Sequence, residues 1–304
     1  MTTKARTRKA KTTKAQDYAS TSTISNLIMV KLSIHRWGGG VADRKLGDEV
    51  AVSKDASQDS IRTLVRYLPK ETRQELGQAS RDLRKAWNNH SLPWDDEAWR
   101  VIRSDQYTEF MKRIQPLQKK VQEAMDAIVM DYDNIKANAT KRLGKLYRDE
   151  KFPTKERLKL MYGTDITQRA IARPADIRVQ GLDKEQEARL KKEMETELEG
   201  RIRDAVMNIT ERLRRLLDDA MKRYGKEDQD GTRYQGLQRR TLETCGYLDS
   251  LNITGDASIS ELVESTRKAL TEFKPIDLRT QPATLNKAKK NAKAVISAID
   301  NFGM

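Results

Sequence analysis

The chain has 304 residues and a net charge of +14, and its charged residues (34%) nearly equal its hydrophobic ones (37%), with only 6% aromatic. This balance is typical of elongated helical proteins with much surface and little core. One cysteine excludes an internal disulfide, and no apolar run approaches the roughly 20 residues of a membrane span, so we expect a cytoplasmic protein that does not enter a membrane.

Residues 1–23 are basic and rich in threonine, and the first 16 positions hold six cations and no acidic residue. Such a segment cannot bury enough surface to offset its chain entropy, so we predict a disordered basic tail that is not a signal peptide. Its charge suits neutralisation of nucleic-acid phosphates, and a solubilising tail is the alternative. The cations are Lys4, Arg6, Arg8, Lys9, Lys11 and Lys14.

A small α/β region is predicted for residues 24–99. Val30, Leu32 and Ile34 alternate with polar residues, which predicts one half-buried strand. The glycines that follow predict a flexible turn, since no phosphate-loop pattern accompanies them. In chain order we expect the strand at 26–36, the turn at Gly38–Gly40, short helices at about 61–68 and 70–87, and a linker at 88–97.

The longest pattern is a pair of amphipathic segments at about 107–147 and 190–224. In both, apolar residues recur in steps of three or four, which places them on one face of an α-helix. Each face has to be buried, so we predict that the two helices pack antiparallel along these stripes. The result is a coiled-coil-like helical hairpin over residues 100–228, in which Pro116 either kinks the first helix or marks a separate start.

The connection between the long helices contains a prolyl stop at Phe152-Pro153 and a short helix at about 158–162. We predict that residues 175–180 form a second strand, which pairs with the first and completes a minor β element. An Asp-x-x-Gln spacing at Asp183 predicts a capping box at the start of the second long helix.

Residues 229–304 are predicted to be a helical C-terminal region. The sequence Ser258–Glu261 resembles a capping box and predicts a helix that runs to about Phe273. A last helix is expected at about 284–300. The complete prediction is a mainly α, elongated protein.

Residues for catalysis or metal binding are scarce. His35 lies on the polar face of the predicted strand and His90 in the linker, without Cys or His at metal-binding spacing. Cys245 fits a small buried residue better than a nucleophile. Asp131 and Asp133 point about 200° apart on a helix and so cannot hold one ion. We predict no enzyme activity, no metal and no cofactor.

Basic residues on two helices are further candidates for binding nucleic acid. The cluster at 141–148 is explained equally well by the preference of helix C-termini for cations. The lysines of the last helix join the tail as predicted nucleic-acid-binding residues. Aromatic residues that would stack bases are missing, so we expect the phosphate backbone to be held. These lysines are Lys287, Lys289, Lys290 and Lys293.

Several short motifs, read in order, resemble an uncharacterised family of tailed-phage and prophage proteins with a domain of unknown function. The resemblance covers about residues 26–270 and implies a phage origin, a helical protein without assigned catalysis, and genes near those of MoxR-type AAA+ ATPases. Ile177 stands where the family pattern has an aromatic residue. The motifs are Trp37-Gly38, Leu92-Pro93-Trp94, Tyr107, Arg142-Leu143-Gly144, Leu146-Tyr147, Phe152-Pro153, Pro174, Ile177-Arg178-Val179 and Leu251-Asn252-Ile253-Thr254.

These observations predict a non-enzymatic phage protein that acts in the cytoplasm of an infected bacterial cell and binds nucleic acid through its basic surface. The alternative is a coiled-coil adaptor for a protein partner such as an AAA+ ATPase or a host factor. Homo-oligomerisation through the long helices is a further expectation, if apolar residues such as Val129 and Leu217 stay uncovered.

Overall fold

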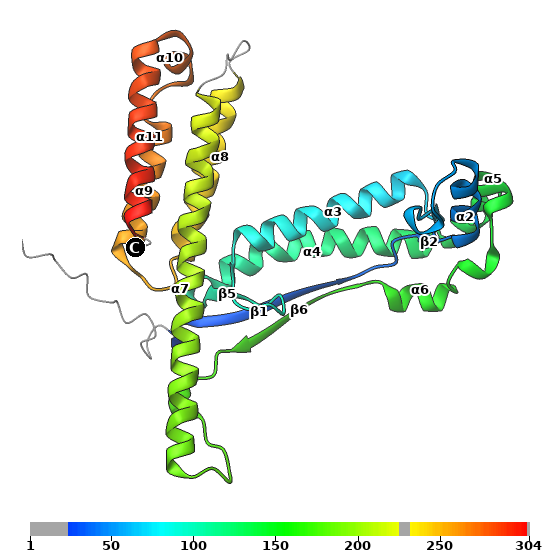
Figure 1. Ribbon diagram of the computed structural model, residues 1–304, viewed down its shortest axis with the longest axis horizontal. Coiled ribbons are helices and arrows are strands. Elements are labelled where there is room, and N and C mark those ends of the chain that lie inside the picture. The colour runs from blue at the N-terminus through cyan, green and yellow to red at the C-terminus, as the bar shows by residue number, and fades with distance from the viewer. Residues whose placement is uncertain (1–23, 225–231, 303–304) are drawn as a thin grey trace, which may run out of the picture.

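The computed structural model describes residues 24–224 and 232–302. It shows helical arms that meet at a small sheet (Figure 1), which confirms a mainly α fold with a minor β element. The helices are α2 (Arg44–Ser53), α3 (Lys70–Asn89), α4 (Tyr107–Met130), α5 (Tyr132–Leu143), α6 (Lys155–Met161), α7 (Lys184–Arg223), α8 (Thr232–Leu248), α9 (Ala257–Thr271), α10 (Pro275–Thr280) and α11 (Pro282–Phe302). The strands are β1 (Leu27–His35), β2 (Gly40–Ala42), β3 (Leu64–Arg66), β4 (Leu92–Pro93), β5 (Arg100–Arg103) and β6 (Gly163–Ala170).

The central sheet has the antiparallel strand order β4-β5-β1-β6. The first predicted strand is confirmed as β1, but the predicted strand at 175–180 is wrong. The long partner of β1 is β6, in register from Ile28 opposite Ala170 to His35 opposite Gly163. Residues Pro174–Asp176 form a 3₁₀ helix instead, because a proline with its fixed φ favours a tight helical turn over a strand.

The two faces of this sheet belong to two separate hydrophobic cores. Successive strand residues point to opposite faces. Leu27 of β1 and Val101 of β5 enter one core, whereas Val30 and Ile102 enter the other. The sheet therefore lies between the two helical parts of the molecule and holds them together.

One core belongs to a hairpin arm, which consists of α3 and α4 with α2, α5 and α6 at its far end (Figure 1). Helix α4 runs unbroken through Pro116 and ends at Met130. The predicted antiparallel pairing of the two long helices is wrong, because α4 packs along α3. The residues shared in this hairpin core include Leu76, Leu83 and Trp87 of α3 and Phe110, Ile114 and Val121 of α4.

The other core belongs to a bundle of α7, α8, α9 and α11, with the short α10 beside them. Helix α7 has 40 residues, and the predicted capping box at Asp183 and Gln186 is confirmed. The apolar stripe of α7 is buried here, in the bundle core, by residues such as Ile202, Ile209 and Leu213. The predicted hairpin at 100–228 and region at 24–99 are therefore wrong divisions, since α3 and α4 form one unit and α7 joins the C-terminal helices.

Three local predictions also fail. Within the expected helix at 61–68, residues Leu64–Arg66 form strand β3, which pairs with β2. Val65 is buried and its two neighbours are exposed, which is the alternation of a strand and not of a helix. Helix α9 is capped by Asp256, whose carboxylate accepts from the Ser258 amide, and not by a box at Ser258. Leu217 is fully buried in the bundle, so it offers no seam for oligomerisation.

Candidate functional site: a basic cleft between the arms

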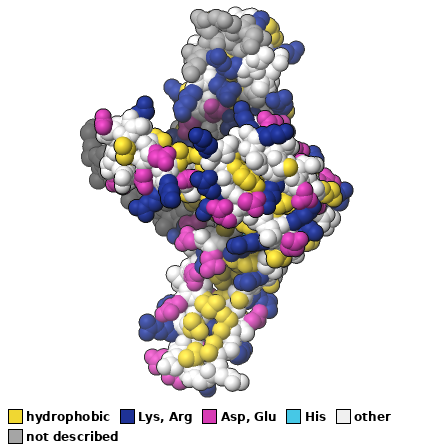
Figure 2. All heavy atoms as spheres, turned by 90° about the vertical axis from the view of Figure 1, so that its right-hand side faces the viewer, with side chains coloured by type: hydrophobic (Ala, Val, Ile, Leu, Met, Phe, Trp, Pro, Cys, Tyr) yellow, Lys and Arg dark blue, Asp and Glu magenta, His cyan; other side chains and the backbone are white. Residues whose placement is uncertain are grey.

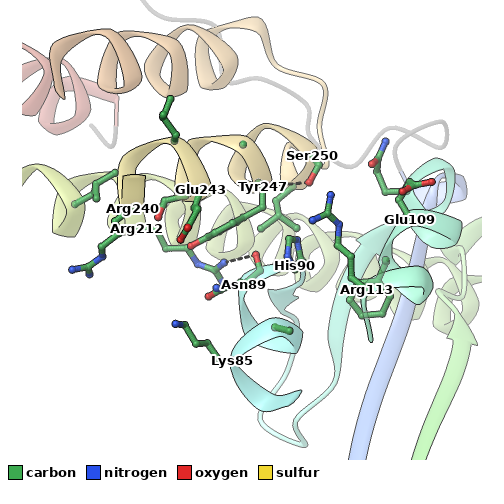
Figure 3. A pocket seen from close by; sticks show the side chains of 18 of the residues that line it. Lys85, Asn89, His90, Glu109, Arg113, Arg212, Arg240, Glu243, Tyr247 and Ser250 are labelled. Carbon is green, nitrogen blue, oxygen red and sulfur yellow. Dashed lines mark hydrogen bonds between the residues drawn. The ribbon is translucent and has the colours of Figure 1, made fainter. Parts of the chain in front are cut away.

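A cleft of about 1050 Å³ lies where the hairpin arm meets the bundle, with walls from α3 and α4 on one side and α7 and α8 on the other. Figure 3 shows Lys85 and Arg113 of the hairpin arm around the same hollow as Arg212 and Arg240 of the bundle. Seven Lys or Arg side chains and three Asp or Glu side chains line it, an excess of four positive charges. An excess of positive charge inside a cleft strengthens the local positive electrostatic potential, which attracts anions.

Three of these cations have no carboxylate partner within the described parts of the chain: Lys85 of α3, Arg113 of α4 and Arg239 of α8. All three are exposed. Because they come from three helices and line one cleft, they are available together to an anionic ligand. Three other lining cations are paired: Arg103 with Asp105 at 2.5 Å, Arg215 with Glu211 at 3.0 Å, and Arg240 with Asp219 at 2.6 Å.

The seventh cation, Arg212, is held in the cleft by the C-terminal end of α3. Its guanidinium donates to the carbonyl oxygens of Asn89 at 3.3 Å and Ser91 at 3.1 Å. Arg100 donates beside it to the Ser91 carbonyl at 2.6 Å and the Ser91 hydroxyl at 2.7 Å. Carbonyls at a helix C-terminus lack helical partners and carry the negative end of the dipole, which favours cations there.

These two arginines keep their charge although they are partly buried and close together. Burial, and then the neighbouring Arg212, lowers the pKa of Arg100 to about 10, and burial lowers the pKa of Arg212. At neutral pH both remain protonated. Since carbonyls and not carboxylates hold them, their positive charge is only partly balanced, and Arg212 presents this charge to the cleft.

His90 and Tyr247 form an aromatic contact across the cleft. Their ring centroids are 5.3 Å apart in an edge-on arrangement. Burial, followed by the charges of Arg113 and Arg212, lowers the pKa of His90 to about 4, so the imidazole is neutral at physiological pH. His90 was predicted to lie in a linker, but it is the C-cap of α3, and it faces this cleft.

The lowered pKa of His90 predicts a loss of stability in acid. In the unfolded chain the imidazole titrates near 6.5, so between about 6.5 and about 4 the unfolded state binds more protons and stability falls as the pH is lowered. We expect about 1–2 kcal/mol from this group once solvent screening is allowed for, because His90 is only partly buried. Urea unfolding at several pH values should show that His90→Gln loses less stability in acid than the wild type.

The control for this measurement is His35→Gln, because His35 is exposed at the end of β1. A His90→Gln protein whose acid sensitivity equals that of the wild type would contradict the assignment.

The predicted binding residues do not lie in this cleft. The tail cations at positions 4–14 fall outside the described residues. Lys287, Lys290 and Lys293 are exposed on α11, while Lys289 is partly buried. In steps of three residues, Lys287, Lys290 and Lys293 form a stripe on the α11 surface, opposite Ala288 and Ala292 of the core. No α11 residue lines the cleft.

The remaining sequence candidates have structural roles. Arg142 of the 141–148 cluster donates to the Arg66 carbonyl at 2.8 Å and so fixes α5 to the end of β3. Cys245 is buried, and burial raises its pKa to about 12, which agrees with a small core residue. Asp133 pairs with Lys155 at 2.8 Å, and the described residues contain no cluster of potential metal ligands that includes Asp131 or Asp133.

Comparison with known proteins found no matching family model, no matching curated protein and no matching solved structure. The resemblance to a phage family therefore stays a prediction. Among the described residues no helix is both long and apolar enough to cross a bilayer.

Proposed function

We propose that the protein binds nucleic acid by its phosphate backbone, and that the cleft between the hairpin arm and the bundle is the contact surface. The observation that carries the proposal is the set of unpaired cations Lys85, Arg113 and Arg239, which three helices bring to one cleft. Arg212 supports them from the base of the cleft. Separate cations on three helices match a chain of phosphates better than a single anion, because successive phosphates along a strand can each contact a different cation.

Binding of this kind is largely independent of sequence. Contacts to phosphates fix the position of a nucleic acid but do not read its bases. Among the aromatic residues that line the cleft, His90 and Tyr247 contact each other edge-on and Phe110 is buried, so they offer little surface on which a base could stack. We therefore expect similar affinities for unrelated sequences.

The decisive measurement is the salt dependence of binding. Replacing Lys85, Arg113 and Arg239 together by glutamine removes three phosphate contacts, so the slope of log affinity against log salt should flatten by about 2.7 on duplex DNA or about 2.1 on single strands. The matched control is the triple replacement of Lys287, Lys290 and Lys293 by glutamine, which removes the same charge from α11. Fluorescence anisotropy titrations on unrelated DNA and RNA sequences at several salt concentrations compare the two.

The two triple variants separate the cleft from general basicity. We expect the cleft variant to lose affinity and the α11 variant to bind almost as the wild type does. Equal losses would show that net charge alone matters. A loss of affinity in the α11 variant alone would place the binding site on the last helix. Absence of binding at low salt would favour the adaptor function.

A variant without residues 1–23 tests the tail in the same titrations. Six tail cations would contribute a slope of up to about −5 on duplex DNA or about −4 on single strands. A slope that stays steep after tail removal but flattens in the cleft variant is the result that the proposal requires.

A further inference from the structure

The N-terminal part of α7 extends beyond the sheet, away from the bundle (Figure 1). The buried residues of α7 begin at Leu198, so the preceding 14 residues, Lys184 to Glu197, which are all described, contain no buried side chain. The segment 171–183 packs along this part of the helix. We call the two together, residues 171–200, the projecting arm.

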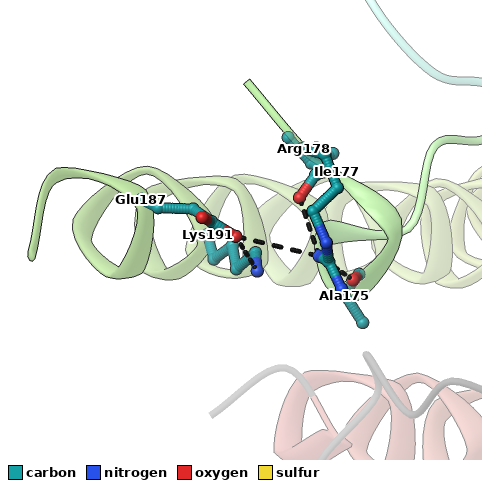
Figure 4. A network of polar contacts seen from close by, with 5 residues as sticks. All are labelled: Ala175, Ile177, Arg178, Glu187 and Lys191. Carbon is teal, nitrogen blue, oxygen red and sulfur yellow. Dashed lines mark hydrogen bonds and ion pairs between the residues drawn. The ribbon is translucent and has the colours of Figure 1, made fainter. Parts of the chain in front are cut away.

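The projecting arm is ordered by its own contacts. Gly181, with φ of 90°, allows the chain to reverse into α7, and the capping box at Asp183 starts the helix. Figure 4 shows Arg178 folded back on the segment, where it donates to the Ala175 and Ile177 carbonyls at 3.0 Å. The carboxylate of Glu187 forms ion pairs with Lys191 at 2.5 Å and with Arg178 at 3.7 Å.

The projecting arm carries an apolar patch that belongs to neither core. Figure 2 shows hydrophobic side chains gathered over this lower end of the molecule. Val179 is 44% and Leu182 is 37% exposed, and Leu190 and Met194 of α7 are partly exposed. Single exposed apolar residues are ordinary, but a group of them on a rigid projection marks a contact surface.

The charge pattern of the projecting arm indicates which partner fits. Residues 184–192 carry four cations and two acids, whereas residues 193–200 carry four glutamates and no cation. In an antiparallel pair of such helices each basic half lies beside the acidic half of the other copy, and the helix dipoles are also opposed. A parallel pair would place four glutamates beside four glutamates.

We propose that the projecting arm is a dimerisation surface, which binds a second copy of this chain antiparallel about a two-fold axis. With the axis level with position 192, Leu190 lies opposite the partner's Met194, and Arg189 lies on the same flank of the helix pair as the partner's Glu193. The same surface then serves both subunits, as in the commonest closed dimers. This association is independent of what the basic cleft binds.

Sedimentation equilibrium over a wide concentration range tests the association. The variants Leu190→Asp and Met194→Asp would bury an uncompensated charge in the interface, and each should weaken dimerisation at least about tenfold. The matched controls are Leu160→Asp and Met130→Asp, at positions that are 87% and 79% exposed elsewhere on the surface. The controls should dimerise as the wild type does.

A wild-type protein that stays monomeric at every concentration would overturn the proposal. So would equal weakening in the control variants, or a dimer that both projecting-arm variants leave intact. Circular dichroism of all four variants should match the wild type, because none of the replaced residues is buried.

Disulfide cross-linking tests the antiparallel arrangement. A mixture of Leu190→Cys and Met194→Cys proteins should form a cross-linked dimer, because these positions face each other. Leu190→Cys alone should not, since its two copies are offset by about 6 Å along the helices in addition to the distance between the helix axes. Cross-linking of Leu190→Cys alone would indicate parallel helices, and absence of cross-linking in both cases would also overturn the arrangement. The native Cys245 is buried and does not interfere.

Discussion

Replacing Ile114 of α4 or Ile209 of α7 by alanine is expected to lower the free energy of unfolding by about 2–5 kcal/mol in each case. Both side chains are fully buried, so each replacement loses apolar contact and leaves a cavity. Urea unfolding followed by circular dichroism measures the losses. Losses of this size in the free energy of unfolding would agree with full burial of both side chains. Whether α4 and α7 share one core is tested by combining the two replacements.

The Ile114→Ala, Ile209→Ala double variant should lose the sum of the two single losses, within about 0.5 kcal/mol. The reason is that Ile114 lies in the hairpin core and Ile209 in the bundle core. Trp87 and Phe110, whose ring centroids are 5.1 Å apart, supply the control pair, and their replacements should not be additive. A coupling of 1 kcal/mol or more between Ile114 and Ile209 would mean that α4 and α7 pack together after all.

Phe152→Ala is expected to destabilise the protein by about 3–5 kcal/mol, through the far end of the hairpin arm. Four aromatic rings surround Phe152. The closest is Tyr67, edge-on at 4.9 Å between centroids, followed by Tyr147 at 5.8 Å, Tyr132 at 6.1 Å and Trp37 at 6.2 Å. Removing the central ring therefore takes one contact from each of four others, beyond the apolar area that is lost.

Phe152→Leu is the matched variant, because it keeps most of the apolar volume but loses the ring geometry, and it should cost less than Phe152→Ala. Thermal unfolding with near-ultraviolet circular dichroism follows the aromatic cluster directly. Nucleic-acid binding by folded Phe152→Ala should be retained, since Phe152 does not line the cleft. A variant as stable as the wild type would contradict this account of the cluster.

The sequence predicts which residues are buried better than it predicts what they are buried against. The alternation of Val30, Leu32 and Ile34 identifies β1 and the face that it turns to the hairpin core, and the steps of three and four identify α4 and α7 as helices. The spacing within a helix carries no information about its partner, so Ile114 and Ile209 look equivalent in the sequence. The deciding element is β6, whose strand pattern is weak because Ile166 is its one strongly apolar residue.

The cleft is less predictable still. Lys85, Arg113 and Arg239 stand on three helices that the sequence does not bring together, and each belongs to a basic run of only two residues, Arg84-Lys85, Lys112-Arg113 and Arg239-Arg240. The dense basic segments at the N-terminus and in the last helix therefore dominate a reading of the sequence. The adjacent Arg239 and Arg240 and the arginines around Arg212 indicate a basic cleft only in combination with the structure, which places α7 and α8 opposite the end of α3.

The four residues of β5 control the geometry of the whole molecule. Its neighbours Val101 and Ile102 point into different cores. A shift of this strand by one residue would exchange their faces. One residue inserted within β5 would thus shift α4, which follows this strand, against the bundle and change the width of the cleft, although every cation that lines it would remain. The spacing of the positive charges is consequently set by a strand that carries none of the three unpaired cations.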